Sequence, residues 1–217
     1  MIGKLRSKIM PFAEAIAKPF AALGINPDLF SVSGLLFAII AAYFLSQKLF
    51  AEAFISALLA VSIDLFDGAV ARLQGKDSLF GNYLETMLDK CVEIFLFIGA
   101  AFLHPIPAIS ALGFSMLASY AKPRAALVII TDNRDWPALG EHAERMLLLL
   151  LGLLLSVFSV SLAGFEALEI FLWLIALISA IGSVQRVLYA RKLIAEAEKS
   201  GNVLPYLKKK SPEKRRD

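Results

Sequence analysis

Four acidic residues lie where two strongly apolar segments of the sequence approach one another. Asp64 and Asp67 follow the run AFISALLAVSI, and Glu85 and Asp89 precede CVEIFLFIGAAFL. Spacings of three and four residues place each pair on one face of a helix, and the short connection makes the two helices antiparallel neighbours. Four carboxylates in a partly dry site repel one another unless cations neutralise them. Oxygen ligands of this kind suit hard cations such as Mg²⁺, Mn²⁺ or Ca²⁺.

Small residues and one arginine accompany these acids. Gly68, Ala71 and Gly81 leave the helix surface bare, so that a ligand or a metal-bound phosphate can approach the backbone. Arg72 adds a cation that can bind a phosphate bidentately. This combination describes a site for a nucleotide diphosphate, in which two metal ions offset the charge on a transferred phosphoryl group. The alternative is an interfacial belt of salt bridges, formed with the nearby basic residues Arg72, Lys76 and Lys90.

The segments that must position these residues are long and apolar. Of the 217 residues, 58% are hydrophobic and 19% are charged, whereas soluble domains lie nearer half and a quarter. Six runs are long enough, at ~17–25 residues, to cross a bilayer as helices. They cover 29–47, 49–71, 83–103, 105–130, 143–163 and 165–190. We therefore expect an all-α integral membrane protein with six transmembrane helices, folded as one domain over residues 1–217 with its bundle at 29–194.

The two ends of the chain are basic and flank the apolar part. Residues 1–23 mix lysines with apolar residues at helical spacing, which predicts an amphipathic interfacial helix and not a cleavable signal peptide. Every Lys and Arg except Lys48 lies on, or adjoins, one side of the six-span topology, so both termini and the acidic cluster are expected to be cytoplasmic. The last helix should continue to about Lys199. The basic tail at 195–217 is expected to contact membrane lipids or solvent and not nucleic acid.

The acidic stretch closely resembles the signature of the CDP-alcohol phosphotransferase family, D-x2-D-G-x2-A-R-x8-G-x3-D-x3-D. Every spacing is kept, and the resemblance covers nearly the whole chain because the six spans and the amphipathic N-terminal helix also match. Glu85 stands where the family usually has Asp, which lengthens that ligand by one methylene. The eight matching positions are Asp64, Asp67, Gly68, Ala71, Arg72, Gly81, Glu85 and Asp89.

The resemblance implies an enzyme of phospholipid biosynthesis. Such enzymes transfer a substituted phosphoryl group from a CDP-linked lipid (CDP-diacylglycerol or CDP-archaeol) to the hydroxyl of a small alcohol and release CMP. Two divalent ions, Mg²⁺ or Mn²⁺, are implied, with Asp89 also acting as the general base, and a homodimer is expected. The implied metal ligands are Asp64, Asp67, Glu85 and Asp89. The implied CDP-binding residues are Gly68, Ala71, Arg72, Asp77 and Gly81.

Four basic residues in the second half of the chain bear on the identity of the alcohol. Lys122 and Arg124 end the fourth apolar segment, Arg145 opens the fifth and Arg186 lies within the sixth. They could contact lipid headgroups, but a cation within an apolar run needs an anionic partner. Convergent cations form a phosphate site, which favours a phosphorylated acceptor. The pattern resembles family members that use inositol phosphate or glycerol phosphate, with inositol phosphate preferred. His142 stands where such members commonly have an extra arginine.

Three alternatives remain at this point. A non-phosphorylated acceptor such as serine would use the same chemistry without the basic residues. A transporter would require charges near the middle of several spans, whereas here they crowd at the cytoplasmic ends. An inactive scaffold is suggested by Glu85 alone, and the other acids of the motif argue against it.

Overall fold

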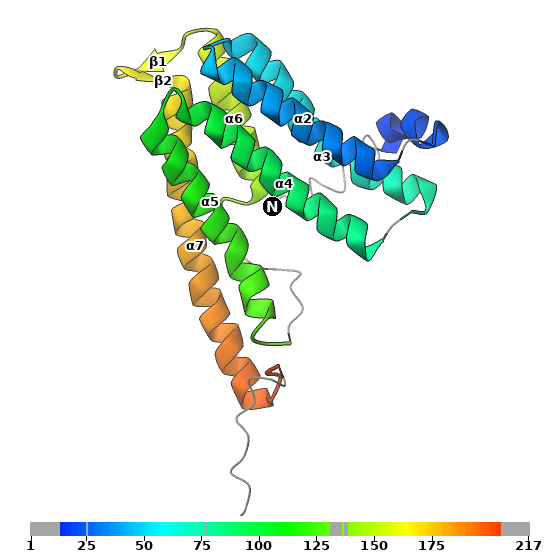
Figure 1. Ribbon diagram of the computed structural model, residues 1–217. Coiled ribbons are helices and arrows are strands. Elements are labelled where there is room, and N and C mark those ends of the chain that lie inside the picture. Colours follow the sequence, from blue (N-terminus) through cyan, green and yellow to red (C-terminus); the bar gives the residue numbers. More distant parts are fainter. Residues whose placement is uncertain (1–13, 25, 77, 131–135, 137–138, 205–217) are drawn as a thin grey trace, which may run out of the picture.

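Six long helices form the described part of the protein in a computed structural model (Figure 1). The structure describes residues 14–24, 26–76, 78–130, 136 and 139–204, without the side chains of residues 27, 28, 64, 65 and 67. Each of the six helices overlaps one of the six apolar segments of the sequence. They are α2 (Pro27–Ser46), α3 (Phe50–Gln74), α4 (Leu79–Ala101), α5 (Pro105–Ala126), α6 (His142–Val157) and α7 (Ala167–Ser200).

Three of the described helices are long and apolar enough to cross a membrane, over Leu29–Ser46, Phe50–Gln74 and Ala167–Ser200. The protein is thus mostly helical with several apolar helices, and the count of six spans stays a prediction. The fifth apolar segment forms a shorter helix than its expected 143–163, because α6 ends at Val157. Ser159, Ala163 and Gly164 have φ of 53°, 54° and 87°, which a right-handed helix cannot accommodate.

A short hairpin replaces the end of that expected helix. Its strands β1 (Ser161–Leu162) and β2 (Phe165–Glu166) pair antiparallel. The hairpin lies where a tight connection was expected, around Gly164 and Phe165. It joins α6 to α7 at the end of the molecule away from the acidic motif (Figure 1).

Local sequence signals fix the reversal between α3 and α4. Gly75 ends α3 in the left-handed region at φ 62°, where a glycine carries no Cβ penalty. The Oγ of Ser78 then accepts a hydrogen bond from the backbone N–H of Gly81 at 2.8 Å and caps the first turn of α4. The chain therefore reverses, and the start of α4 lies beside the end of α3, as the acidic motif requires.

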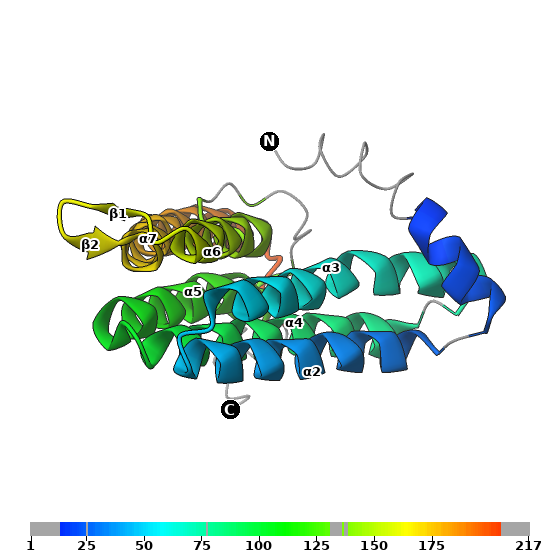
Figure 2. The ribbon, with the colours of Figure 1, turned by 90° about the horizontal axis from the view of Figure 1, so that it is seen from above.

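The helices pack in two groups that meet in the middle of the molecule. The first group is α2 with α3 and α4, the second is α5 with α7, and α6 packs on both α7 and α3 (Figures 1 and 2). Small residues allow close approach in the first group: a Cβ on Gly99 would lie 2.6 Å from the Cα of Ala42. Close backbone contact through Gly and Ala is typical of helices that associate in membranes.

A helical N-terminal segment, residues 14–22, lies across the ends of α2 and α3 (Figure 2). Ala17 is fully buried in a small cluster with Ala69 and Val70 of α3, and the rings of Phe20 and Phe30 meet edge to face at 5.1 Å. Residues 1–13 of the expected interfacial helix at 1–23 lie outside the described residues. Its apolar face, where described, packs on the bundle.

The last helix is the longest of the described elements. At 34 residues and 1.5 Å per residue it measures about 50 Å, more than the ~30 Å core of a bilayer. It ends at Ser200, within one residue of expectation, and Gly201 caps it at φ 76°. Val203 then forms an isolated bridge with Ile129, which ties the end of α7 to the chain after α5.

Candidate active site

The structure brings the end of α3 and the start of α4 together at Gly68. A Cβ on Gly68 would lie 3.6 Å from Oε1 of Glu85 and 3.3 Å from Nη1 of Arg72. The carboxylate and the guanidinium therefore both lie next to the bare backbone of one glycine. This is the convergence expected of the motif, with an acid from α4 facing a glycine of α3.

The other motif residues are described to different extents. The backbone of Asp64 and Asp67 belongs to α3, but their side chains lie outside the described part, as does all of Asp77. Asp89 lies one turn after Glu85 on α4. The described residues contain no group of three or more His, Cys, Asp or Glu that could hold a metal ion. Since two of the four expected ligands lie outside the described side chains, the predicted ligand set stays a prediction.

Gly81 has a structural role that the sequence did not reveal. Its backbone N–H donates to the Ser78 cap, and a Cβ at this position would lie 3.0 Å from the Ser78 Oγ. That distance is shorter than almost any real Cβ contact. Gly81 therefore supplies the backbone N–H that the Ser78 side chain caps at the first turn of α4.

A fifth acid, Glu93, lies one turn beyond Asp89 on α4, and the sequence analysis missed it. Its side chain is fully buried, and four hydrogen bonds reach it. Nε and Nη2 of Arg145 bind its two oxygens at 2.6 and 3.0 Å. Lys90 Nζ lies at 2.8 Å and His142 Nδ1 at 3.2 Å from Oε2. The regular step of four residues from Glu85 through Asp89 to Glu93 was the available signal.

Two of the predicted phosphate-binding residues meet on α5. Nη2 of Arg145 donates to Oγ of Ser119 at 3.4 Å, and Nη1 of Arg186 donates to the carbonyl of Ala118. The structure therefore places arginines from α6 and α7 on adjacent residues of α5. The Nε of Arg186 is buried and has no hydrogen-bond partner among the described residues.

Lys122 and Arg124 lie further along α5. Lys122 comes one turn after Ala118, on the same side of the helix and half-buried. Arg124 is exposed in the last turn. The geometry thus groups Lys122 with Arg145 and Arg186, while Arg124 lies on a different face of α5.

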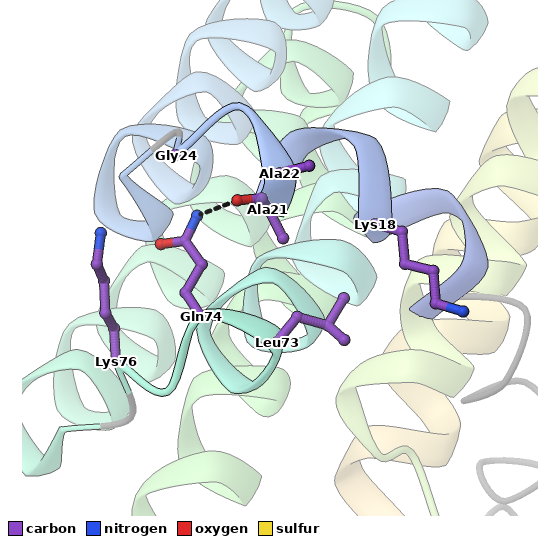
Figure 3. A pocket seen from close by; sticks show the side chains of 7 residues that line it. All are labelled: Lys18, Ala21, Ala22, Gly24, Leu73, Gln74 and Lys76. Carbon is purple, nitrogen blue, oxygen red and sulfur yellow. Dashed lines mark hydrogen bonds between the residues drawn. The ribbon is translucent and has the colours of Figure 1, made fainter.

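An open pocket of about 450 Å³ lies on another face of α3, beneath the N-terminal segment (Figure 3). At 100° per residue, Leu73 and Gln74 point well away from the Gly68 side of the helix, so this pocket is separate from the motif. Gln74 Nε2 donates to the carbonyl of Ala21 at 3.4 Å across it (Figure 3). The lining residues are Lys18, Ala21, Ala22, Gly24, Leu73, Gln74 and Lys76.

The comparison with known families identifies one family. Residues 25–182 match the CDP-alcohol phosphatidyltransferase family over most of the chain. The chain belongs to this family of transferases, which confirms the resemblance found in the motif. An archaetidylinositol phosphate synthase of Pyrococcus horikoshii is 31% identical over 202 residues, covering 88% of this chain and 97% of that protein.

Solved structures share the fold. A Mycobacterium tuberculosis phosphatidylinositol phosphate synthase with CDP-DAG bound superposes with a TM-score of 0.67 at 24% identity, covering 92% of this chain and 98% of that one. The same enzyme in complex with manganese and citrate gives a TM-score of 0.71 at 23% identity, covering 92% and 93%. At these identities the likeness establishes the common helical architecture.

Proposed function

We propose that this protein transfers a substituted phosphoryl group from a CDP-linked lipid to a hydroxyl of inositol phosphate and releases CMP. The observation that carries the choice of acceptor is the meeting of Arg145 and Arg186 at adjacent residues of α5. A phosphorylated alcohol needs such a group of cations beside the acidic motif, whereas serine or free inositol does not. The relative from Pyrococcus horikoshii, whose name specifies an inositol phosphate product, supports the same choice.

Two divalent ions, Mg²⁺ or Mn²⁺, would complete the acidic motif. Four carboxylates at this spacing match the oxygen donors that such ions prefer, and Glu85 already faces Gly68 across the gap between α3 and α4. When bound, the ions would offset the charge on the phosphates of the donor. The ligands in this proposal are Asp64, Asp67, Glu85 and Asp89.

The CDP part of the donor would lie against the bare surface at the end of α3. Gly68 and Ala71 leave room for the diphosphate next to the backbone, and Arg72 already lies beside Gly68. A guanidinium at this position can bind a phosphate bidentately. Asp77 and Gly81 would border the site from the connection and from the first turn of α4.

Asp89 is proposed as the general base. Its carboxylate would take the proton of the acceptor hydroxyl while the acceptor oxygen forms a bond to the phosphorus of the donor that carries the lipid. The bond between that phosphorus and the CMP oxygen breaks, and CMP leaves with the electron pair. Positioning of the two substrates supplies much of the acceleration in phosphoryl transfer.

The acceptor phosphate would bind among the basic residues of α5, α6 and α7. Arg186 offers a buried Nε donor, and Lys122 adds a flexible cation one turn from Ala118. Arg145 contributes charge from a fully buried position. Arg124, exposed at the end of α5, would meet the outer side of the phosphate or lipid headgroups.

The arrangement in the membrane is part of the proposal. We place both termini and the active site on the cytoplasmic side, with six spans, because the basic residues cluster at that end of the chain's helices. The N-terminal segment packs against α3 near the motif, which supports a common side for the two. A homodimer remains our expectation.

A CMP-release assay tests the proposal. Purified protein is given CDP-diacylglycerol or CDP-archaeol with inositol phosphate, glycerol phosphate, free inositol or serine, in Mg²⁺, Mn²⁺ or chelator. We expect metal-dependent CMP release with inositol phosphate as the preferred acceptor. Preference for glycerol phosphate would retain the chemistry and change the acceptor, and preference for serine would refute the phosphate site.

A further inference from the structure

Glu93 is the meeting point of two helices that carry different parts of the proposed site. It lies on α4 after Glu85 and Asp89, at steps of four residues that keep all three on one face. Its partners Arg145 and His142 open α6. A single buried carboxylate therefore connects the helix of the metal ligands to the helix of the acceptor site.

Basic residues surround the Glu93 carboxylate. Lys90 and Arg145 are two cations bound to one carboxylate, and His142 is a third donor. Arg186 adds another cation from α7. The opposing charges at the start of α6 are Glu141, which lies within reach of Arg186, and Glu144.

Glu93 also limits how Arg145 can act. An arginine has five N–H donors, and four are used: two on Glu93, one on the Gly140 carbonyl and one on Ser119. Among the described residues, one N–H of Nη1 is left for a ligand. The direction of that donor is set by the two bonds to Glu93, since a planar guanidinium held at two nitrogens cannot rotate.

His142 is oriented by the same carboxylate. A carboxylate only accepts hydrogen bonds, so Nδ1 of His142 carries the proton that points to Oε2 of Glu93. The opposite ring nitrogen, Nε2, accepts a hydrogen bond when the ring is neutral and donates one when both nitrogens carry protons. His142 is partly exposed, with 26% of its side chain accessible. It occupies the position at which the sequence analysis noted the absence of an extra arginine.

Stability alone does not account for such a cluster. Replacing a buried ion pair by apolar residues of similar size is often neutral or stabilising, whereas removing one partner is strongly destabilising. A cluster of ionised residues in a helical bundle therefore indicates a function.

We propose that Glu93 is a positioning residue of the acceptor site. Its carboxylate fixes the guanidinium of Arg145 and the accessible ring of His142 at the start of α6, and ties both to the turn of α4 that follows Asp89. His142 would meet the acceptor phosphate through Nε2–H with both ring nitrogens protonated, and Arg145 would contribute its charge. This inference rests on the proposed function and deepens it. It assigns selectivity for a phosphorylated acceptor to a residue that itself touches neither substrate.

The test compares selectivity between two acceptors that differ by one phosphate. Wild type, Glu93→Gln and Glu93→Asp are assayed for CMP release with inositol phosphate and with free inositol, at a temperature well below each melting temperature. KM for the CDP-lipid and the melting temperature in detergent are measured on the same preparations. Glu166→Gln is the control, because it removes a carboxylate that pairs with His104 at 3.1 Å and lies at the hairpin end of the molecule.

We expect Glu93→Gln to raise the KM for inositol phosphate about 10–100-fold, as loss of an orienting partner does at metal sites. The KM for the CDP-lipid and the rate with free inositol should stay near wild type. Glu93→Asp keeps the charge but has a side chain shorter by one methylene. Its KM for inositol phosphate should therefore lie between those of wild type and Glu93→Gln. Glu166→Gln should match wild type.

The outcomes distinguish failure of the proposed function from failure of the positioning role of Glu93. Wild type without activity on inositol phosphate refutes the proposed function. If wild type has that activity and the Glu93 variants keep the same preference for inositol phosphate over inositol, only the positioning role is refuted. Proportional loss with both acceptors, or failure of both Glu93 variants to fold, makes Glu93 a stability residue and also overturns the inference.

Discussion

The carboxylate of Glu85 lies against the backbone of Gly68, such that a Cβ on this glycine would approach its Oε1 to 3.6 Å. One residue comes from α4, which begins after Ser78, and the other from α3, which ends before Gly75. Because Nη1 of Arg72 lies 3.3 Å from the same Cβ position, two side chains of opposite charge lie next to this glycine. A diphosphate with its metal ions fits a surface of that kind.

Filling this space should impair the donor site. Gly68→Val would displace the side chains of Arg72 and Glu85, and a misplacement of about 1 Å can cost ~10²-fold in rate. We expect kcat/KM for the CDP-lipid to fall at least ~10-fold. Gly113→Val is the control, since a Cβ on Gly113 in α5 would meet no described atom within 4 Å. Equal activity of the two variants would contradict a donor site at Gly68.

Removal of a ligand charge should abolish activity. Asp64→Asn or Asp67→Asn would weaken binding of the divalent ions, because a neutral amide is a poorer ligand for a hard cation than a carboxylate. CMP release should become undetectable in either variant and in wild type with excess chelator. Glu198→Gln, an exposed change near the end of α7, should have no effect. Full turnover of wild type in chelator would refute the metal requirement.

The unusual glutamate of the motif can be tested by its length. Glu85→Asp should retain at least part of the activity, because both side chains offer carboxylate oxygens and differ only in reach. Glu85→Ala should lose it. The comparison needs titrations of activity against Mg²⁺ and Mn²⁺, in which Glu85→Asp is expected to shift the midpoint. Normal turnover of Glu85→Ala would show that this position is not a ligand.

Much of this architecture could be predicted from the sequence. Six apolar runs gave six helices, because length and continuous hydrophobicity leave a chain few other ways to satisfy its backbone. The family followed from eight spaced positions, of which Gly68 and Glu85 now prove adjacent. Gly75 and Ser78 are ordinary helix-end signals, so the reversal that unites the motif was also accessible from the sequence.

The features that escaped prediction depend on contacts between distant residues. Glu93 was overlooked because its partners Arg145 and His142 are 52 and 49 positions away, and no local pattern states which helices become neighbours. The early end of α6 depends on backbone angles at Ser159 and Ala163, residues that do not ordinarily favour positive φ. Tertiary packing decided both.

Arg186 should act on the acceptor. Arg186→Ala removes a half-buried cation whose Nε has no described partner, and a lost hydrogen bond to a charged group costs about 1.5–3 kcal/mol. The KM for inositol phosphate should therefore rise ~10–150-fold, since every 1.4 kcal/mol is tenfold, while the KM for the CDP-lipid stays constant. Arg191→Ala, an exposed change on the same helix, is the control. An unchanged acceptor KM in Arg186→Ala would contradict a phosphorylated acceptor.

Replacement of Asp89 can distinguish a role in metal binding from a role in proton transfer. It lies one turn beyond Glu85 and one turn before Glu93 on α4, between the expected metal ligands and the cluster that we assign to the acceptor. A general base contributes ~10²–10⁴-fold to the rate, and Asp89→Asn keeps the shape of the side chain while removing its capacity to accept a proton. We therefore expect the variant to bind the CDP-lipid with metal and to transfer more slowly by that factor. Equilibrium binding of the donor, combined with the single-turnover rate of the bound complex, distinguishes the roles. Loss of donor binding with an intact rate for the bound donor would leave Asp89 only its role as a metal ligand and contradict its role as the base.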